Sequence, residues 1–404
     1  MQLLTIPPLI VTSSLNRKIT DKLINPFNIM TTFYFRRSVE KAFQLDEQPF
    51  ELSLNTKNQI NCDPPYITSA VDDVMYIVNQ IVERSLATSQ KAVITSVVPT
   101  LARLLGSDFI GMTQRKMRDE SYPKATIQGA PPAEQTIIAF LVLINNLDVA
   151  TDYVKRIVQS RVDAGAAAGL TNGGESAPFR SLTALFPLEH DAASVASTLQ
   201  SLQSTVEMKA FDLISDGITV VFKNIMKPRL RPLLADAFRD VDYHLTKEEL
   251  GDLSRETEAD DGESSTPDYP VQYHFQRGWD TLTKPVTRIL TERNNEKLLA
   301  MIISYLAEVL EKRIWSYFGR LDDIGAVHLE RDIVGIVGIV VRGGRYGLRD
   351  TFARCTQICL VMNMEHDEWE ELQAASPETR SESIEFKIDD DERTRARAMV
   401  QDRR

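Results

Sequence analysis

The sequence predicts an all-α protein built from several small helical bundles. Apolar residues recur at intervals of three and four along nearly all of the 404 residues, whereas the strict alternation of a half-buried strand is hard to find. Hydrophobic residues make up 43% of the chain and charged residues 25%, as in ordinary globular domains. A chain of this length is expected to hold about two to four compact units.

The first bundle is predicted at residues 61–162, after an incomplete N-terminal segment with a partial helix at residues 1–60. Val71, Val74 and Val78 recur on one face of an amphipathic helix, with charged residues elsewhere around it. Farther along, the run EQTIIAFLVLINNLDVATDYVKRIV is apolar around much of its circumference. We therefore expect the helix formed by this run to lie between other helices.

Changes in composition predict the remaining boundaries. Residues 163–187 are rich in Gly, Ala, Ser and Pro, which indicates a flexible joint. Helical patterning then resumes, and Pro228 is expected to stop or kink its helix. Acidic and small residues dominate a solvated loop at about 246–270. We therefore expect a helical bundle at residues 188–320 that carries this loop, and a small C-terminal helical domain at residues 321–404.

A long helix is predicted near the end of the second bundle. Leu298 and Ile302 lie on its apolar face. Glu308, Glu311 and Lys312 are expected to face water.

Charge and cysteine usage narrow the class of protein. The net charge of -11 argues against nucleic-acid binding, because an acidic chain gains nothing from releasing phosphate counterions. Cys355 and Cys359 lie one helical turn apart in an apolar run, which favours buried thiols over a metal site. No secretory signal is supported, and no run reaches the roughly 20 uninterrupted apolar residues that span a bilayer. We expect a cytosolic protein that touches membranes only from outside.

The sequence contains no recognisable reaction centre. The glycines of GIVGIVVRGGRYG lack the Lys-Ser/Thr pair of a phosphate-binding loop and interrupt a helical run. No nucleophile with a base, and no metal-ligand set, occurs at convincing spacing. We expect no catalysis, no cofactor, no metal and no small-molecule substrate.

A first charged cluster, with Lys227, Arg229 and Arg231, opens the run KPRLRPLLADAFRDV. It is either the solvated start of a helix with internal ion pairs or a basic patch. A basic patch would receive an acidic helix of a partner or anionic lipid headgroups.

A second charged cluster surrounds the run LRDTFARC. Arg349 and Asp350 are candidate partner-binding residues. Arg354 is flanked by Phe352 and Cys355, so we expect it to be half buried. A half-buried guanidinium requires an acceptor, since an unpaired charge costs several kcal/mol.

Several longer blocks resemble one known family. They include FNIMTTFYFRRSVEKAFQLDE, SAVDDVMYIVNQIVERSLATS, GSDFIGMTQRKMRDESYP, AFDLISDGITVVFKNIMKPRLRPLLADAFRDVDYHLT and LRDTFARCTQICLVMNME. From about residue 13 to residue 365, they follow the order found in the C-terminal half of subunit four of the conserved oligomeric Golgi complex. The first dozen residues do not resemble the family, and its N-terminal half has no counterpart. A truncated gene model or a fragment is therefore expected.

The resemblance implies an elongated stack of small helical bundles, the helical-rod fold of multisubunit tethering complexes. It implies a non-catalytic subunit that tethers retrograde vesicles within the Golgi, so that glycosylation enzymes are recycled. The implied partners are sister subunits, Golgi SNAREs and Rab GTPases, with peripheral contact at the cytoplasmic face of the Golgi membrane. It also implies that Arg354 pairs with a glutamate near the C-terminus, for which Glu392 is the nearest candidate.

An alternative function remains open from the residues alone. The chain could be a peripheral membrane-binding adaptor that uses the basic patch around Arg229 and Arg231 on anionic lipid.

Overall fold

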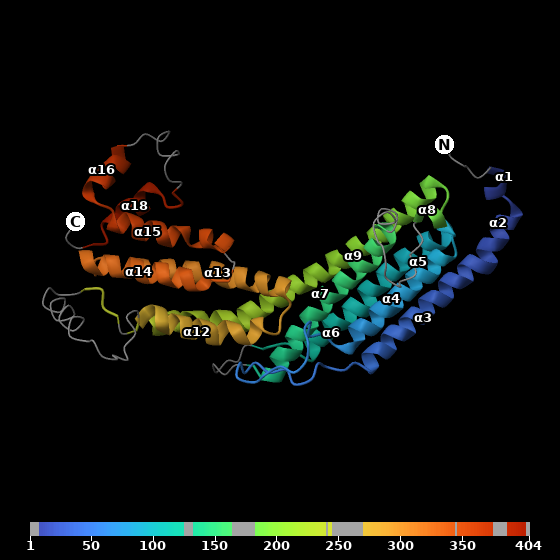
Figure 1. Ribbon diagram of the computed structural model, residues 1–404, viewed down its shortest axis with the longest axis horizontal. Helices are drawn as coiled ribbons and strands as arrows, with labels where there is room; N and C mark the ends of the chain where they lie inside the picture. The colour runs from blue at the N-terminus through green and yellow to red at the C-terminus, as the bar shows by residue number, and fades with distance from the viewer. Residues whose placement is uncertain are drawn as a thin grey trace, which may run out of the picture. The chain divides into compact units, whose positions relative to one another are not determined.

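The regular structure of the described residues is helical, apart from an isolated parallel bridge between Leu321 and Val400 (Figure 1). This confirms the predicted all-α class. The computed structural model describes residues 8–124, 132–163, 182–239, 241–244, 270–343, 346–374 and 386–400.

The chain forms two compact units. Unit 1 comprises Met1–Val220 with Pro285–Asn295, and unit 2 comprises Val221–Lys284 with Glu296–Arg404. The division into five parts expected from the sequence stays a prediction. Of its two connecting segments, the joint at 163–187 lies outside the described residues except at its ends, and the acidic loop at 246–270 does so except for Pro270.

Unit 1 is a bundle whose helices bury the expected faces. Val71, Val74 and Val78 are all fully buried on α4, and α7 buries residues around most of its circumference. The helices are α1 (Pro8–Val11), α2 (Ser14–Ile19), the π-helical turn η1 (Thr20–Ile24), α3 (Asn25–Gln44), α4 (Ser69–Ala87), α5 (Lys91–Leu104), the π-helical turn η2 (Leu105–Ile110), α6 (Gly111–Asp119), α7 (Glu134–Val162), α8 (Leu182–Leu185) and α9 (Glu189–Val221).

Two polar side chains of α7 hold one loop of unit 1 against this core helix. Asn145 donates to the Ile289 carbonyl over 2.8 Å and accepts from the Thr291 N–H over 3.0 Å. Asp148 accepts from the Thr291 hydroxyl over 2.7 Å and from Arg293 over 2.9 Å. Because buried polar groups are costly unless hydrogen-bonded, these contacts explain why a largely apolar helix contains them.

Among the described residues, two helical stretches of unit 1 are long and apolar enough to cross a membrane by composition alone. They are Lys91–Asp119 and Glu134–Val162, whose most apolar windows are 56% and 72% buried inside the structure. Helices in the core of a bundle have the same composition.

Unit 2 begins where α9 passes into a π-helical turn. Pro228 was expected to stop or kink its helix, but it occupies the first turn of α10, where a missing N–H costs nothing. The helical elements are η4 (Phe222–Met226), α10 (Lys227–Ala237), α12 (Pro270–Thr287), α13 (Glu292–Trp315), α14 (Asp323–Val340), the 3₁₀ turn η5 (Tyr346–Phe352), α15 (Ala353–Asn363), α16 (His366–Ala374) and α18 (Asp390–Arg397). Helices α12 and α13 each contribute residues to both units.

Tyr243 anchors the short segment 241–244 to α14 within unit 2. Its side chain is buried and packs edge-on against the Tyr317 ring, with the centroids 5.1 Å apart. Its hydroxyl donates to a carboxylate oxygen of Asp332 over 2.8 Å. Burial raises the pKa of Asp332, and the Tyr243 hydrogen bond, Arg331, His328 and Gln272 only partly offset this rise.

Replacing Asp332 with asparagine is expected to remove part of the pH dependence of stability. Because the folded state raises the pKa of Asp332, its proton stabilises that state at low pH, and this contribution is lost as pH rises from about 4 through the raised pKa. Wild type and Asp332→Asn should therefore be similarly stable near pH 4, with the variant the more stable at neutral pH. Thermal unfolding of both proteins across this pH range measures the difference in their stability. A difference that does not change with pH would contradict a raised pKa of Asp332 in the folded state.

Candidate functional site

Arg354, on the first turn of α15, joins three parts of unit 2. Its Nε and Nη2 donate to the two carboxylate oxygens of Glu311 on α13, over 3.0 and 2.8 Å. The same Nη2 donates to Glu392 on α18 over 2.6 Å, and Nη1 donates to the Lys387 carbonyl over 2.9 Å. We call Arg354, Glu311 and Glu392 the Arg354 cluster.

Glu392 is positioned by the start of its own helix. It completes a capping box with Asp389, whose side chain accepts from the Glu392 N–H over 2.7 Å. In return, one oxygen of Glu392 accepts from the Asp389 N–H over 3.1 Å, which leaves the other oxygen for Arg354. The cap of α18 therefore also fixes an acceptor of Arg354.

Glu311 is the member of the cluster that the sequence did not indicate. It was expected to face water with Glu308 and Lys312, but its side chain is only 22% exposed and receives both prongs of the guanidinium. The expectation is wrong for Glu311 because helical periodicity says which face a residue occupies, and not which distant element packs there.

The electrostatics agree with a charged network. Hydrogen bonds from Arg354 lower the pKa of Glu392, and hydrogen bonds to Glu311 and Glu392 raise the pKa of Arg354. Arg354 and Glu392 are therefore both charged at neutral pH. Side-on pairing with one carboxylate is the geometry for which a guanidinium is best suited.

Aromatic contacts add a second attachment of α18 to α13. The Arg395 guanidinium lies 4.7 Å from the Trp315 ring centroid and 5.7 Å from that of Phe318. Met399 and Val400, which follow α18, are buried. The last helix is thus fixed by charge, cation–π contact and apolar packing together.

The structure places the first charged cluster on the exposed side of α10. The Lys227 ammonium lies 4.8 Å from the Tyr305 ring centroid, and Arg229 and Arg231 are exposed. In the part of the chain that the structure describes, neither arginine has an ion-pair partner. Lys227 and Arg231 share a face at four-residue spacing, whereas Arg229 points elsewhere. Lys223, four residues before Lys227 on η4, is also exposed and was not among the predicted residues.

Arg349 and Asp350 lie on η5 and are both exposed. Asp350 accepts an ion-paired hydrogen bond from Lys387, whereas no partner of Arg349 occurs among the described residues. The structure therefore does not pair these two candidates with each other, and Asp350 helps to hold the segment before α18.

Groups that could support chemistry are separated or buried. Cys355 and Cys359 are buried in α15, and burial raises the pKa of Cys355 to about 12, so its thiol stays protonated.

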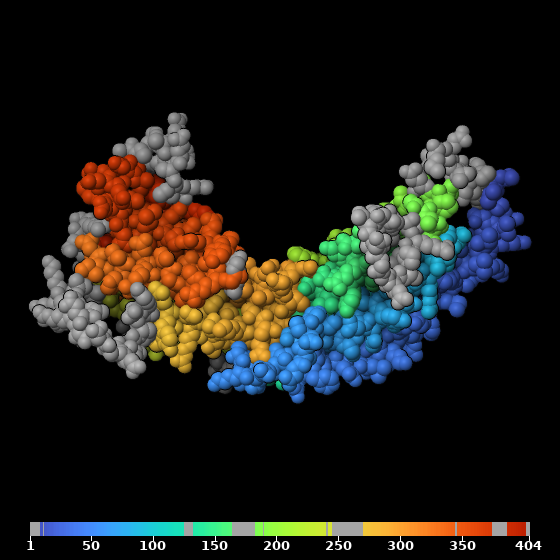
Figure 2. Space-filling model, in the orientation of Figure 1, coloured from blue at the N-terminus to red at the C-terminus, as the bar shows by residue number. Residues whose placement is uncertain are grey.

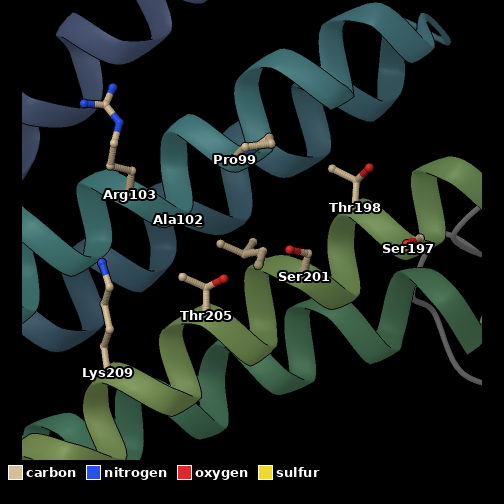
Figure 3. Close-up of a pocket in the computed structure, with 9 residues that line it drawn as sticks. Pro99, Ala102, Arg103, Ser197, Thr198, Ser201, Thr205 and Lys209 are labelled. Atoms are coloured by element: carbon tan, nitrogen blue, oxygen red, sulfur yellow. The ribbon is translucent and has the colours of Figure 1, made fainter.

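A groove of about 360 Å³ in unit 1 lies between α5 and α9. Figure 3 shows Lys209 reaching from α9 toward α5, while Arg103 points away from α9. The nine residues that line the groove include no histidine, cysteine or carboxylate. No group of metal-ligating side chains occurs among the described residues.

The chain is similar to one family of subunits over most of its length. Residues 140–395 match the family described as conserved oligomeric Golgi complex subunit 4, C-terminal, and residues 1–117 match the COG4 transport protein, middle alpha-helical bundle. Proteins named conserved oligomeric Golgi complex subunit 4 are similar in sequence. The Arabidopsis thaliana protein is 24% identical over 83% of this chain and 39% of its own length. The Saccharomyces cerevisiae protein is 22% identical over 95% of this chain and 50% of its own length. The Homo sapiens protein is 24% identical over 85% of this chain and 42% of its own length.

A solved structure shares the fold. The C-terminal domain of the exocyst subunit Sec6p superposes with a TM-score of 0.50 at 12% sequence identity, covering 96% of this chain and 91% of that one. This supports the predicted class of helical tethering-complex folds. The chain spans between 39% and 50% of the length of the three relatives given above. Because one family model alone matches more than half of its residues, the chain belongs to the family of conserved oligomeric Golgi complex subunit 4.

Proposed function

We propose that this chain is a non-catalytic subunit of a Golgi vesicle-tethering complex. In this role it acts in retrograde transport within the Golgi, and so in the recycling of glycosylation enzymes. The observation that carries the proposal is the pair of family matches, at residues 1–117 and 140–395, on a chain whose described residues are helical. The fold shared with an exocyst subunit supports a scaffolding role.

The proposed partners are sister subunits of the complex, Golgi SNAREs and Rab GTPases. The chain is proposed to lie peripherally on the cytoplasmic face of the Golgi membrane. Exposed charged residues such as Arg229, Arg231 and Arg349 are proposed contact points, because charge complementarity selects partners. The Arg354 cluster is proposed to keep the C-terminal helices together.

Affinity purification of the tagged chain from its own cells tests the proposal. We expect the sister subunits to be recovered, and we expect depletion of the chain to misplace Golgi glycosylation enzymes and to alter lectin binding at the cell surface. A chain recovered without sister subunits, together with normal glycosylation after its depletion, would refute the proposed function.

A second candidate function is a membrane-binding adaptor. The observation that favours it is the exposure of Arg229 and Arg231 on α10 without an ion-pair partner among the described residues. Cations near an anionic membrane each contribute about 1 kcal/mol, so such a patch could hold the chain on a vesicle surface.

Reversing both charges separates the two functions. If the patch binds lipid, Arg229→Glu with Arg231→Glu should weaken flotation with phosphatidylserine vesicles by about thirtyfold or more. Arg84→Glu with Arg156→Glu reverses the same number of exposed charges in unit 1 and is the matched control. Equal flotation of the double variant, the control and the wild type would exclude the adaptor function of this patch.

A further inference from the structure

The N-terminal helices of unit 1 expose an apolar face. Neither α2 nor η1 contains a buried residue, and the buried residues of α3 are confined to its second half. In Figure 2 this region is the blue surface along the outside of unit 1. Helix α3 packs against α4 and α5, and Asn28 in its first half donates to the Ser96 hydroxyl over 2.7 Å. It therefore belongs to the bundle while its outer side stays uncovered.

The exposed apolar residues form a row that is one residue wide along α2 and η1 and broader in α3, where Ile29 and Tyr34 are also exposed. Its members, which we call the N-terminal seam, are Leu15, Ile19, Leu23, Met30 and Phe33. The first three are spaced by four residues, a spacing that drifts by about 40° per step around a regular α-helix. The wider π-helical turn Thr20–Ile24 offsets this drift, so that the seam continues into α3.

The exposure of the seam is unusual for a folded domain. Leu15 is 65% exposed, Met30 70% and Phe33 66%. Single exposed apolar residues are common, but a continuous row of large ones marks a surface that another molecule covers.

Basic residues follow one edge of the seam. Lys18 and Lys22 each come three residues after a seam residue, and Arg37 comes four residues after Phe33, which places them beside the apolar row. Within the described ranges, Lys18 and Lys22 have no ion-pair partner, and Arg37 pairs only with Glu40 of its own helix. This edge is therefore complementary to an acidic surface.

We propose that the N-terminal seam docks one amphipathic α-helix with an acidic flank, supplied by a sister subunit, an identification that rests on the proposed function. Along α2 and η1, an apolar row one residue wide at four-residue spacing is the pattern of helix-on-helix packing. A helix that lies on a membrane usually presents a broad apolar face, whereas in α2 and η1 polar Asn16 and Thr20 border the other edge of the seam. The unpaired lysines select an acidic flank on the docked helix.

Co-purification of the full chain with co-expressed sister subunits tests the seam. Met30→Glu places a charge in the middle of the seam and should reduce recovery of one sister subunit by about tenfold or more. Met208→Glu is the matched control, because Met208 is 66% exposed on α9 of the same unit and lies outside the seam. Circular dichroism should show equal helicity in both variants, since neither side chain is buried.

Two further measurements identify the occupant. Lys18→Glu with Lys22→Glu should weaken the same subunit's recovery without any change to the apolar row. A photo-crosslinking residue at Leu23 should capture an amphipathic, acidic segment of that subunit. Crosslinking to a second copy of this chain would overturn the proposal, as would loss of phosphatidylserine-vesicle binding as the sole defect. If Met30→Glu recovers the sister subunit as well as wild type does, the docking role of the seam is overturned, but the proposed function is not. If the wild type recovers no sister subunit, the proposed function itself is refuted.

Discussion

Replacing Gly325 with alanine is expected to lower the melting temperature of unit 2 by about 6–12 °C. An added Cβ at this position on α14 would lie 1.7 Å from the Tyr243 carbonyl oxygen, well inside any contact distance. The obstacle is backbone, so it cannot move aside as a flexible side chain could. Overpacking of this kind costs about 3 kcal/mol, and about 2–4 °C accompanies each kcal/mol in a domain of this size.

The same helix supplies the control. Gly338 also lies on α14, but an added Cβ there would meet nothing within 4 Å. Because glycine is a poor helix former, Gly338→Ala should leave stability unchanged or raise it by about 0.5–1 kcal/mol. The Gly325 N–H, which donates to Asp322 over 2.6 Å, is retained in the alanine variant, so the comparison isolates the steric contact. Equal melting temperatures for the two variants would show that segment 241–244 does not rest on Gly325.

Helix faces could be predicted from the sequence, but the contacts between distant helices could not. The burial of Val71, Val74 and Val78 follows from their spacing alone. The approach of Tyr243 to Gly325 has no such signal, because a glycine in a helical pattern does not reveal what lies against it. The π-helical turn before Pro228 was also missed, since its geometry depends on packing on both sides of the helix.

In the Arg354 cluster, too, one contact could be predicted from the sequence and another could not. A half-buried arginine in an apolar run indicates that an acceptor is needed, and family resemblance pointed to Glu392. The structure places Glu392 within 2.6 Å of Arg354. It also brings Glu311 to the same guanidinium from 43 residues away in sequence. No local pattern distinguished Glu311 from Glu308, which is exposed on the same helix.

Replacing Arg354 with methionine is expected to destabilise unit 2 by about 2–3 kcal/mol. Methionine keeps much of the apolar stem but leaves the carboxylates of Glu311 and Glu392 without a cation between them. Loss of one partner of a buried ion pair costs about 3–5 kcal/mol, and we lower this value because the Arg354 side chain is 36% exposed. Thermal unfolding should show a fall of about 4–12 °C.

Two companion variants separate charge from geometry in the Arg354 cluster. Arg354→Lys keeps the positive charge but not the two-pronged contact with Glu311, so its stability should lie between wild type and Arg354→Met. In Arg354→Met, adding Glu311→Gln should restore part of the lost stability, because one of the two unpaired carboxylates is removed.

The Arg354 pairing also predicts a dependence on pH. The lowered pKa of Glu392 stabilises the folded state above the ordinary glutamate pKa of about 4.3, and this contribution is lost as pH falls through the lowered value. The stability gap between wild type and Arg354→Met should therefore be widest at neutral pH and narrow in acid. A gap that stayed constant, or a lysine variant as unstable as the methionine variant, would mean that Arg354 acts by packing and not by its charge.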